Sequence, residues 1–186
     1  MGDLPTAIGP YRIIRLLGEG GMGAVYEARQ DPLDRRVALK TLHPEHARSQ
    51  DAVARFFNEA RVLSRLEHPS IVQVFDFGTA PEGTAYLVME FLRGESMAHR
   101  LRDLADRGER LATSTALQFT WQVADILSVA HAQGIVHRDI KPDNLMLVAD
   151  PVAPGGERVK VLDFGIAKLT KGTEQSGVKT DTQAVI

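Results

Sequence analysis

Several common features are missing from this sequence of 186 residues, and each absence narrows what the chain can be. It has no cysteine, which excludes disulfide bonds and thiolate metal sites and is typical of a reducing compartment. No apolar run approaches the ~20 residues that a membrane-spanning helix needs. With 22 basic and 24 acidic residues the net charge is −2, so the basic excess of an electrostatic nucleic-acid binder is also missing. We therefore expect no nucleic-acid partner and no membrane segment in this chain.

The N-terminal string MGDLPTAIG lacks a basic region followed by an apolar stretch, so it does not resemble a secretory signal. Hydrophobic residues make up 44% of the chain and charged residues 25%, which is enough to build a hydrophobic core. Together with the missing cysteines, these features fit a cytoplasmic protein, with any membrane tether lying outside these residues.

The two halves of the chain have different patterns. In the first half, short stretches rich in β-branched and aromatic residues predict strands. These stretches cover residues 11–18, 24–29, 36–42, 70–78 and 84–92. Helical patterns cover residues 51–67, a segment from Ser96 to Gly108 that Ser96 can cap, and a longer segment to His131 that Thr113 or Ser114 can cap. The strand-rich half meets the helical half near residues 91–94.

Glu59 is unusual because it lies inside the apolar arc of the predicted helix, beside Leu63. A carboxylate that faces a core is costly unless a cation meets it. One interpretation is therefore that Glu59 has a positive partner elsewhere in the chain. The other is that Glu59 lies at the edge of the arc and reaches water, and the helical wheel alone favours this second interpretation.

The string GEGGMG places Gly18, Gly20 and Gly23 in G-x-G-x-x-G spacing. Glycines at such positions let backbone N–H groups approach phosphate oxygens without a Cβ in the way. A dinucleotide-binding fold uses the same spacing but continues into a helix, whereas a strand is predicted here, with Val25 placed to cover a flat apolar ligand. A Walker A loop would continue with Gly-Lys-Ser/Thr, which is absent.

Three further polar groups have a chemical interpretation. Lys40, at the end of a strand, is either a solvated edge residue or a phosphate clamp held by Glu59. HRDIKPDN (residues 137–144) is either a polar turn or a loop with a proton-accepting carboxylate, a phosphate-neutralising lysine and a cation-binding amide. In DFG (residues 163–165) an aspartate follows an apolar strand and suits Mg²⁺. His43 and His46 have no ligand cluster nearby in the sequence and are interpreted as loop residues.

The order and spacing of these four motifs resemble the protein-kinase signature set. The chain resembles a eukaryotic-type (Hanks-type) serine/threonine protein kinase of the bacterial branch, over residues 10–186. The resemblance implies an α+β, bilobal fold with an antiparallel β N-lobe, one regulatory helix and a mainly helical C-lobe. It also implies a tail at residues 1–9, an N-lobe at 10–92 and the start of a C-lobe at 93–186.

The resemblance implies a site for ATP with Mg²⁺, or alternatively Mn²⁺. The implied catalytic residues are Asp139 as the base, Lys141 at the γ-phosphate, and Lys40 at the α- and β-phosphates, paired with Glu59. The implied metal ligands are Asn144 and Asp163. The implied nucleotide-binding residues are Leu17, Gly18, Glu19, Gly20, Gly21, Met22, Gly23, Ala24, Val25, Ala38, Lys40, Met89, Glu90, Leu92 and Met146. His137, Phe164 and Leu63 resemble the packed spine that aligns the lobes.

The implied reaction is transfer of the ATP γ-phosphoryl group to Ser or Thr hydroxyls of a protein substrate. Autophosphorylation in trans within a dimer is included, and Thr180 and Thr182 resemble its target sites. Two alternatives stay open. One is a truncated nucleotide-binding or scaffolding module with little activity, and the other is a small-molecule phosphotransferase of related fold, which peptide and small-molecule assays would separate.

Kinase domains of this family continue beyond the activation segment, whereas the sequence ends within it, at Ile186. We therefore expect an incomplete C-lobe, in which the apolar face formed by Leu117, Trp121, Ala124 and Leu127 loses partners. Residues 1–186 alone should then be poorly stable and weakly active. Autophosphorylation at a rate comparable to that of a chain extended by about half its length would contradict this prediction.

Overall fold

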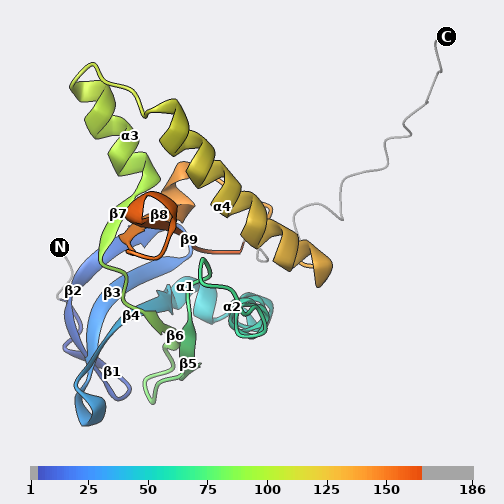
Figure 1. Cartoon of the computed structure of the whole chain (residues 1–186). Coiled ribbons are helices and arrows are strands. Elements are labelled where there is room, and N and C mark those ends of the chain that lie inside the picture. The colour runs from blue at the N-terminus through green and yellow to red at the C-terminus, as the bar shows by residue number, and fades with distance from the viewer. Residues whose placement is uncertain (1–3, 165–186) are drawn as a thin grey trace, which may run out of the picture.

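The computed structural model describes residues 4–164, which form two antiparallel sheets with helices packed against them (Figure 1). The larger sheet has the strand order β1-β2-β3-β4-β6-β5, and the smaller one the order β7-β8-β9. The strands are β1 (Ala7–Ile8), β2 (Tyr11–Gly20), β3 (Gly23–Gln30), β4 (Arg35–Leu42), β5 (Val74–Thr79), β6 (Ala85–Glu90), β7 (Gly94–Ser96), β8 (Leu145–Ala149) and β9 (Glu157–Val161). The α-helices are α1 (Pro44–Ala47), α2 (Gln50–Leu63), α3 (Met97–Asp106) and α4 (Thr113–Ala132).

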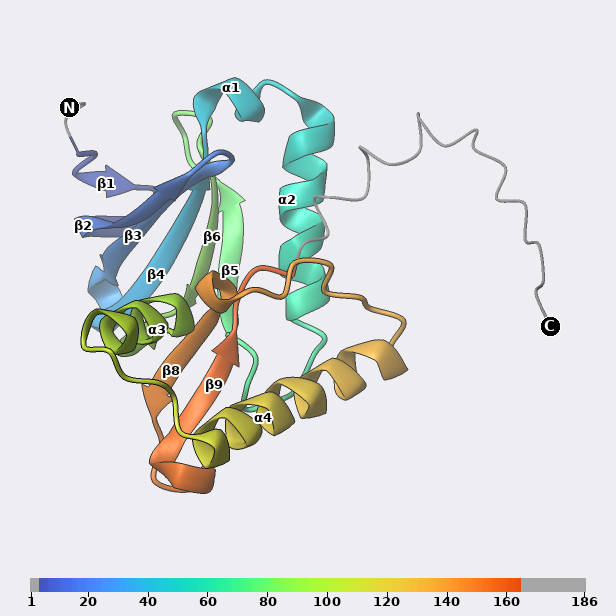
Figure 2. The ribbon, with the colours of Figure 1, turned by 90° about the horizontal axis from the view of Figure 1, so that it is seen from above.

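The side chains of β6 alternate between two hydrophobic cores, one on each face of the larger sheet. Leu87 and Met89 belong to the core that the sheet shares with α2, and Tyr86 and Val88 belong to a second core on the opposite face. The strand is therefore covered on both faces, as its nearly continuous apolar sequence predicts. Figure 2 shows α2 running beside β5 and α4 running beside β9.

The helix termini confirm one predicted cap and correct another. Ser96 Oγ accepts the N–H of His99 at 3.1 Å, as expected of an N-cap. The predicted cap of α4 by Thr113 or Ser114 is wrong: Thr113 is already helical, and Ala112 occupies the N-cap position without a side-chain bond. An alanine cap gives up the hydrogen bond of a polar cap, so packing rather than capping must define this end of the helix.

The strand predicted over residues 70–78 is shorter than expected. β5 begins at Val74, while Ile71 forms a parallel bridge to Val161 of the smaller sheet. The N–H of Val161 donates to the carbonyl of Ser70 at 2.8 Å. Ser70 and Ile71, which were predicted to begin this strand, therefore join the two sheets instead of extending the larger one.

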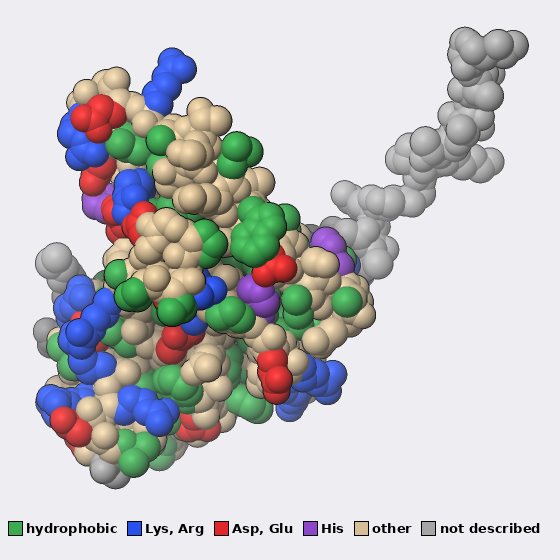
Figure 3. Space-filling model, in the orientation of Figure 1, with side chains coloured by type: hydrophobic (Ala, Val, Ile, Leu, Met, Phe, Trp, Pro, Cys, Tyr) green, Lys and Arg blue, Asp and Glu red, His purple; other side chains and the backbone are tan. Residues whose placement is uncertain are grey.

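α4 anchors the smaller sheet on one face and is exposed on the other. Gln122 is buried and bonds β9 at both ends of its amide, donating to the carbonyl of Glu157 at 3.0 Å and accepting the N–H of Val159 at 2.9 Å. On the other side, Leu117 is 66% exposed and Trp121 is 59% exposed. Hydrophobic side chains are visible over α4 in Figure 3. Even so, none of the helices between residues 4 and 164 is long and apolar enough to cross a membrane.

A glycine pair tests the close contact between β3 and β4. A Cβ on Gly23 would lie 1.7 Å from the carbonyl oxygen of Thr41, whereas a Cβ on Gly20 would meet nothing within 4 Å. We expect Gly23→Ala to lower the free energy of unfolding by about 1–3 kcal/mol, because the strands must separate. Gly20→Ala, the matched control, should change it little. Equal unfolding midpoints in urea for both variants would show that the strands do not approach this closely.

Candidate active site

Lys40 lies between two carboxylates from distant parts of the chain. Its Nζ is 2.6 Å from Oδ1 of Asp163, which follows β9, and 3.5 Å from Oε1 of Glu59 in α2. Glu59 is only 6% exposed, so the interpretation that it reaches water is wrong and the predicted pairing with Lys40 is confirmed. Lys40 supplies the cation that a carboxylate in a core requires.

The charges of this group follow from the shared ammonium. Burial alone would lower the pKa of Lys40, but the carboxylates of Asp163 and Glu59 outweigh it, and the net pKa of Lys40 is raised. Burial raises the pKa of Glu59. The ammonium of Lys40 lowers this pKa but lies closer to Asp163, so it offsets only part of the effect of burial. Lys40 therefore stays charged at neutral pH and offers a fixed positive charge to an anion.

The loop after α4 brings Asp139, Lys141 and Asn144 together. A 3₁₀ turn over Pro142–Asn144 folds the chain back, so that Asn144 Nδ2 donates to the main-chain carbonyl of Asp139 at 2.8 Å and to its Oδ2 at 3.2 Å. Lys141 Nζ is 3.6 Å from the same Oδ2. These two side chains orient the carboxylate of Asp139, which remains 23% exposed and accessible to a proton donor.

His137 connects this loop to the segment that carries Asp163. Its Nε2–H donates to the carbonyl of Leu162 at 2.9 Å, and its Nδ1 accepts the N–H of Asp139 at 3.2 Å. One ring nitrogen donates and the other accepts, so the imidazole is neutral. Burial, the largest influence, lowers the pKa of His137. The ring also packs on Phe164, with 4.5 Å between the ring centroids.

The turn between β2 and β3 has open space where side chains would otherwise lie. A Cβ on Gly18, Gly20 or Gly21 would meet nothing within 4 Å, which fits the predicted approach of a phosphate. Gly23 differs, because the contact between β3 and β4 already requires a glycine there. The other predicted residues of the hairpin are Leu17, Glu19 and Met22, which are exposed, and Ala24, which is buried.

The apolar residues predicted to enclose adenine come from both sheets. Ala38 pairs with Met89 across β4 and β6, and Val25 packs against the same core cluster. Met146 lies in β8 of the smaller sheet, and Leu92 follows β6 and is half-buried. The structure thus gathers three of these residues in one cluster and places Met146 in the neighbouring sheet.

Lys160 of β9 is a contact of the predicted hinge that the motifs did not reveal. Its Nζ lies 2.5 Å from Oε1 of Glu90 and 3.1 Å from the carbonyl of Ile71. The same Glu90 oxygen accepts the N–H of Gln73 at 2.9 Å. Glu90 therefore ties the end of β6 to β9 through its carboxylate, in addition to the backbone role predicted for it. The available signal was a lysine within the otherwise apolar run VKVL.

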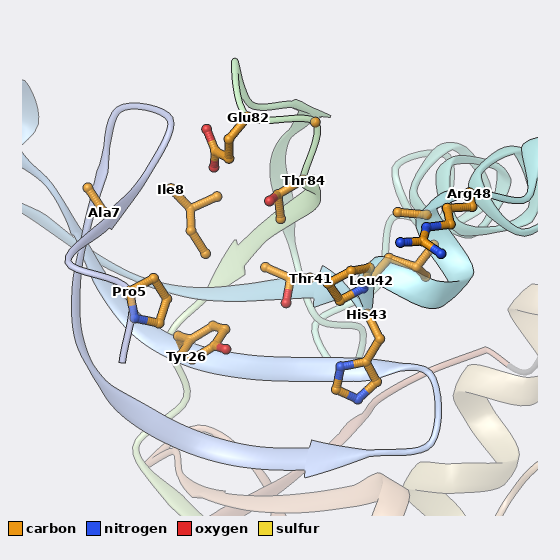
Figure 4. A pocket seen from close by; sticks show the side chains of 13 residues that line it. Pro5, Ala7, Ile8, Tyr26, Thr41, Leu42, His43, Arg48, Glu82 and Thr84 are labelled. Carbon is orange, nitrogen blue, oxygen red and sulfur yellow. The ribbon is translucent and has the colours of Figure 1, made fainter. Parts of the chain in front are cut away.

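Cavity size does not locate this site. A cavity of about 550 Å³ opens beside the end of β4, between β1, α1 and the β5–β6 turn, and none of the predicted site residues lines it (Figure 4). A cavity of only about 20 Å³ lies at the charged group itself. Its walls include Met22, Lys40, Phe56 and Glu59.

A family model described as a protein kinase domain matches residues 11–184 of the chain. The chain belongs to the protein kinase family. The kinase pkn3 of Myxococcus xanthus, a serine/threonine-protein kinase, is 41% identical over 170 residues, which are 91% of this chain and 30% of that protein. The serine/threonine-protein kinase PknA of Mycobacterium tuberculosis is 44% identical over 167 residues, which are 88% of this chain and 36% of that protein.

The crystal structure of the PknI kinase domain of Mycobacterium tuberculosis has a TM-score of 0.70 to this kinase chain and 32% sequence identity. The match covers 89% of this chain and 63% of that one, and it confirms the predicted α+β, kinase-like fold. The chain thus spans about a third of the length of each of these two curated relatives. The predicted phosphorylation sites Thr180 and Thr182 lie outside the described residues.

Acidification is expected to destabilise this kinase fold through His137. Burial lowers the pKa of His137 in the folded state below the unfolded value of about 6.5. The neutral imidazole therefore makes its full contribution to folding stability when the pH is above about 6.5. The contribution is lost as the pH falls below about 6.5 toward the folded pKa. Urea unfolding between about pH 7 and 5 should therefore show a steeper loss for the unmodified chain than for His137→Phe. Parallel pH profiles would contradict the neutral, buried imidazole.

Proposed function

We propose that this chain is a serine/threonine protein kinase that transfers the γ-phosphoryl group of ATP to a protein hydroxyl. The observation that carries the proposal is the convergence of two charged groups, Lys40 with its carboxylates and Asp139 with Asn144, linked through His137. The relatives named serine/threonine-protein kinases support the same reaction. Lys141, two residues after Asp139, resembles the serine/threonine kinases rather than the tyrosine kinases, which carry other residues there, and so supports Ser or Thr as the acceptor.

ATP is proposed to bind between the glycine-rich turn and the smaller sheet. Lys40 would contact the α- and β-phosphates, and the raised pKa of Lys40 supports this role because the ammonium stays charged. The phosphates would then replace Asp163 as the nearest partner of Lys40. Asp163 is 49% exposed, so its carboxylate can turn to another ligand without being stranded in the core. Val25, Ala38 and Met146 would enclose adenine, next to Met89 and the backbone of Glu90 and Leu92.

Asn144 and Asp163 are proposed to hold Mg²⁺, or alternatively Mn²⁺. The donor set fits, because both residues offer the oxygen ligands that hard cations prefer. The amide hydrogens of Asn144 are used on Asp139, which leaves its carbonyl oxygen for the cation. The N–H of Leu162 donates to the main-chain carbonyl of Asn144 at 2.9 Å and keeps the two ligand segments side by side. Held by Asn144 and Asp163, the cation would supply positive charge that neutralises the phosphates.

In the proposed step, the hydroxyl oxygen of the substrate attacks the γ-phosphorus. A new O–P bond forms, the bond from the γ-phosphorus to the bridging oxygen breaks, and ADP leaves with that electron pair. The hydroxyl proton passes to the carboxylate of Asp139, which Asn144 orients. Lys141 would neutralise the oxygens of the transferred group, so catalysis rests mainly on positioning and electrostatics.

The lobe boundaries, the protein substrate and the site of action are also proposed. Strands β2 to β6 of the larger sheet support an N-lobe at residues 10–92, and the start of β7 at Gly94 supports a C-lobe at 93–186. β1 of the same sheet lies in the tail at residues 1–9. A Ser/Thr-containing protein is the proposed substrate, with autophosphorylation in a dimer at Thr180 and Thr182. The use of ATP and the absence of cysteine support a cytoplasmic site of action.

Replacement of the proposed base provides the most direct activity test. Asp139→Asn removes the proton acceptor but keeps the size and shape of the side chain. We expect phosphorylation of a Ser/Thr peptide in MgATP to slow by about 100-fold or more, while the affinity for MgATP changes little. The measurement is initial-rate transfer of the γ-phosphoryl group, together with calorimetric titration of MgATP.

Asp143→Asn is the matched control, because it makes the same charge change on an exposed residue of the same loop and should keep the full rate. Phosphorylation that survives Asp139→Asn would exclude Asp139 as the base. An unmodified chain that binds MgATP but phosphorylates nothing would instead support the non-catalytic alternative.

A further inference from the structure

Two histidines beyond the end of β4 contact the turn between β2 and β3. His43 Nε2 lies 2.9 Å from the carbonyl oxygen of Gly20, and His46 Nε2 lies 2.9 Å from that of Gly21. The main-chain N–H of His43 donates to the carbonyl of Met22 at 3.0 Å. Since a carbonyl can only accept, each ring carries its proton on Nε2. Three consecutive carbonyls of the turn are thus held by one short segment.

Holding the carbonyls also determines where the N–H groups of the turn point. The described peptide bonds are all trans, and the carbonyl and N–H of a trans peptide point in opposite directions. Because the carbonyl of Gly20 points at His43, the N–H of Gly21 points away from it. Because the carbonyl of Gly21 points at His46, the N–H of Met22 points away from that ring. Successive backbone N–H groups of a turn can form a concavity that binds anions.

The turn lies next to the cation of the proposed ATP site. Met22 lines the cavity of about 20 Å³ together with Lys40, Phe56 and Glu59. Figure 4 shows His43 extending from the end of β4 toward the hairpin turn. Met22 of the turn and Lys40 therefore border the same cavity.

The turn needs such external contacts because its own sequence defines its conformation poorly. Gly20 and Gly21 have no side chain, and a Cβ on either would meet nothing within 4 Å. Glycine-rich segments lose much conformational entropy when a ligand orders them, and this loss weakens binding. Hydrogen bonds from the histidines restrict the turn before the ligand arrives and so reduce that loss.

We infer that His43 and His46 are positioning residues, which hold the β2–β3 turn so that its N–H groups face the phosphates of ATP. The inference rests on the proposed kinase function, because that function identifies the anion. Neither histidine acts on the phosphates directly; each acts through a backbone carbonyl. Their sequence context predicts plain loop residues, and only the fold brings them to the turn.

The first test needs no nucleotide. In the full chain, ¹⁵N relaxation should give order parameters for the amides of Gly21 and Met22 near the rigid value of about 0.85. In His43→Leu with His46→Leu, which fills similar space without a donor, they should fall below about 0.6. Unchanged order parameters would overturn the inference at this step. Thermal unfolding of each variant shows whether the fold is retained.

The second test separates phosphate binding from adenine binding. Loss of the two donors should raise the Kd for MgATP by about threefold to tenfold, while the Kd for adenosine, which has no phosphates, stays unchanged. The Gln variants His43→Gln and His46→Gln place an amide donor near the position of Nε2 and should restore most of the affinity. His99→Leu, a change at an exposed histidine of α3, is the matched control and should bind MgATP normally.

Each outcome has a distinct meaning. Normal MgATP affinity in the Leu variants would overturn the positioning role alone. Equal weakening of MgATP and adenosine would also overturn it, because the effect would then not involve the phosphates. Failure of the unmodified chain to bind MgATP would overturn the proposed kinase function itself.

Discussion

The ammonium of Lys40 is where three parts of the chain meet. β4 carries the lysine, α2 supplies Glu59, and the segment after β9 supplies Asp163. Lys40 and Glu59 would each be costly to bury alone, and removal of one leaves the other uncompensated, at a cost of about 3–5 kcal/mol for a buried pair. The helix and the two sheets are thus favoured in the one arrangement in which these charges remain together.

Polar contacts also fix the smaller sheet against the larger one. Lys160 of β9 binds the carboxylate of Glu90 at the end of β6, and the N–H of Val161 donates to the carbonyl of Ser70. His137 in turn ties the loop that carries Asp139 to the carbonyl of Leu162. These contacts matter for the proposed chemistry because phosphoryl transfer needs little covalent help from the protein and depends on the relative positions of charges. A site built across the junction of two sheets can keep Lys40 and Asp139 at a set separation only if that junction is well defined.

Motif order and spacing predicted which polar residues lie together in the candidate site, because Asp139, Lys141 and Asn144 are close in the sequence as well as in the structure. Periodicity placed Glu59 in an apolar arc but could not show whether its carboxylate reaches water or meets a cation. The cation is Lys40, which lies on another element. The helix α4 begins without a polar cap because tertiary packing overrides local propensity. His43 and His46 show the clearest limit: their contacts are to backbone carbonyls, which carry no side-chain signature in any sequence.

The proposed role of Glu59 is to hold Lys40 in place for the phosphates of ATP. A double-mutant cycle of Lys40→Met and Glu59→Gln, read out as the Kd for MgATP, tests it directly. We expect each single change to weaken binding and Glu59→Gln to add almost nothing once Lys40 is replaced, with a coupling energy of at least about 1 kcal/mol. Additive effects of the two changes would contradict it, because they would mean that Glu59 and Lys40 act independently.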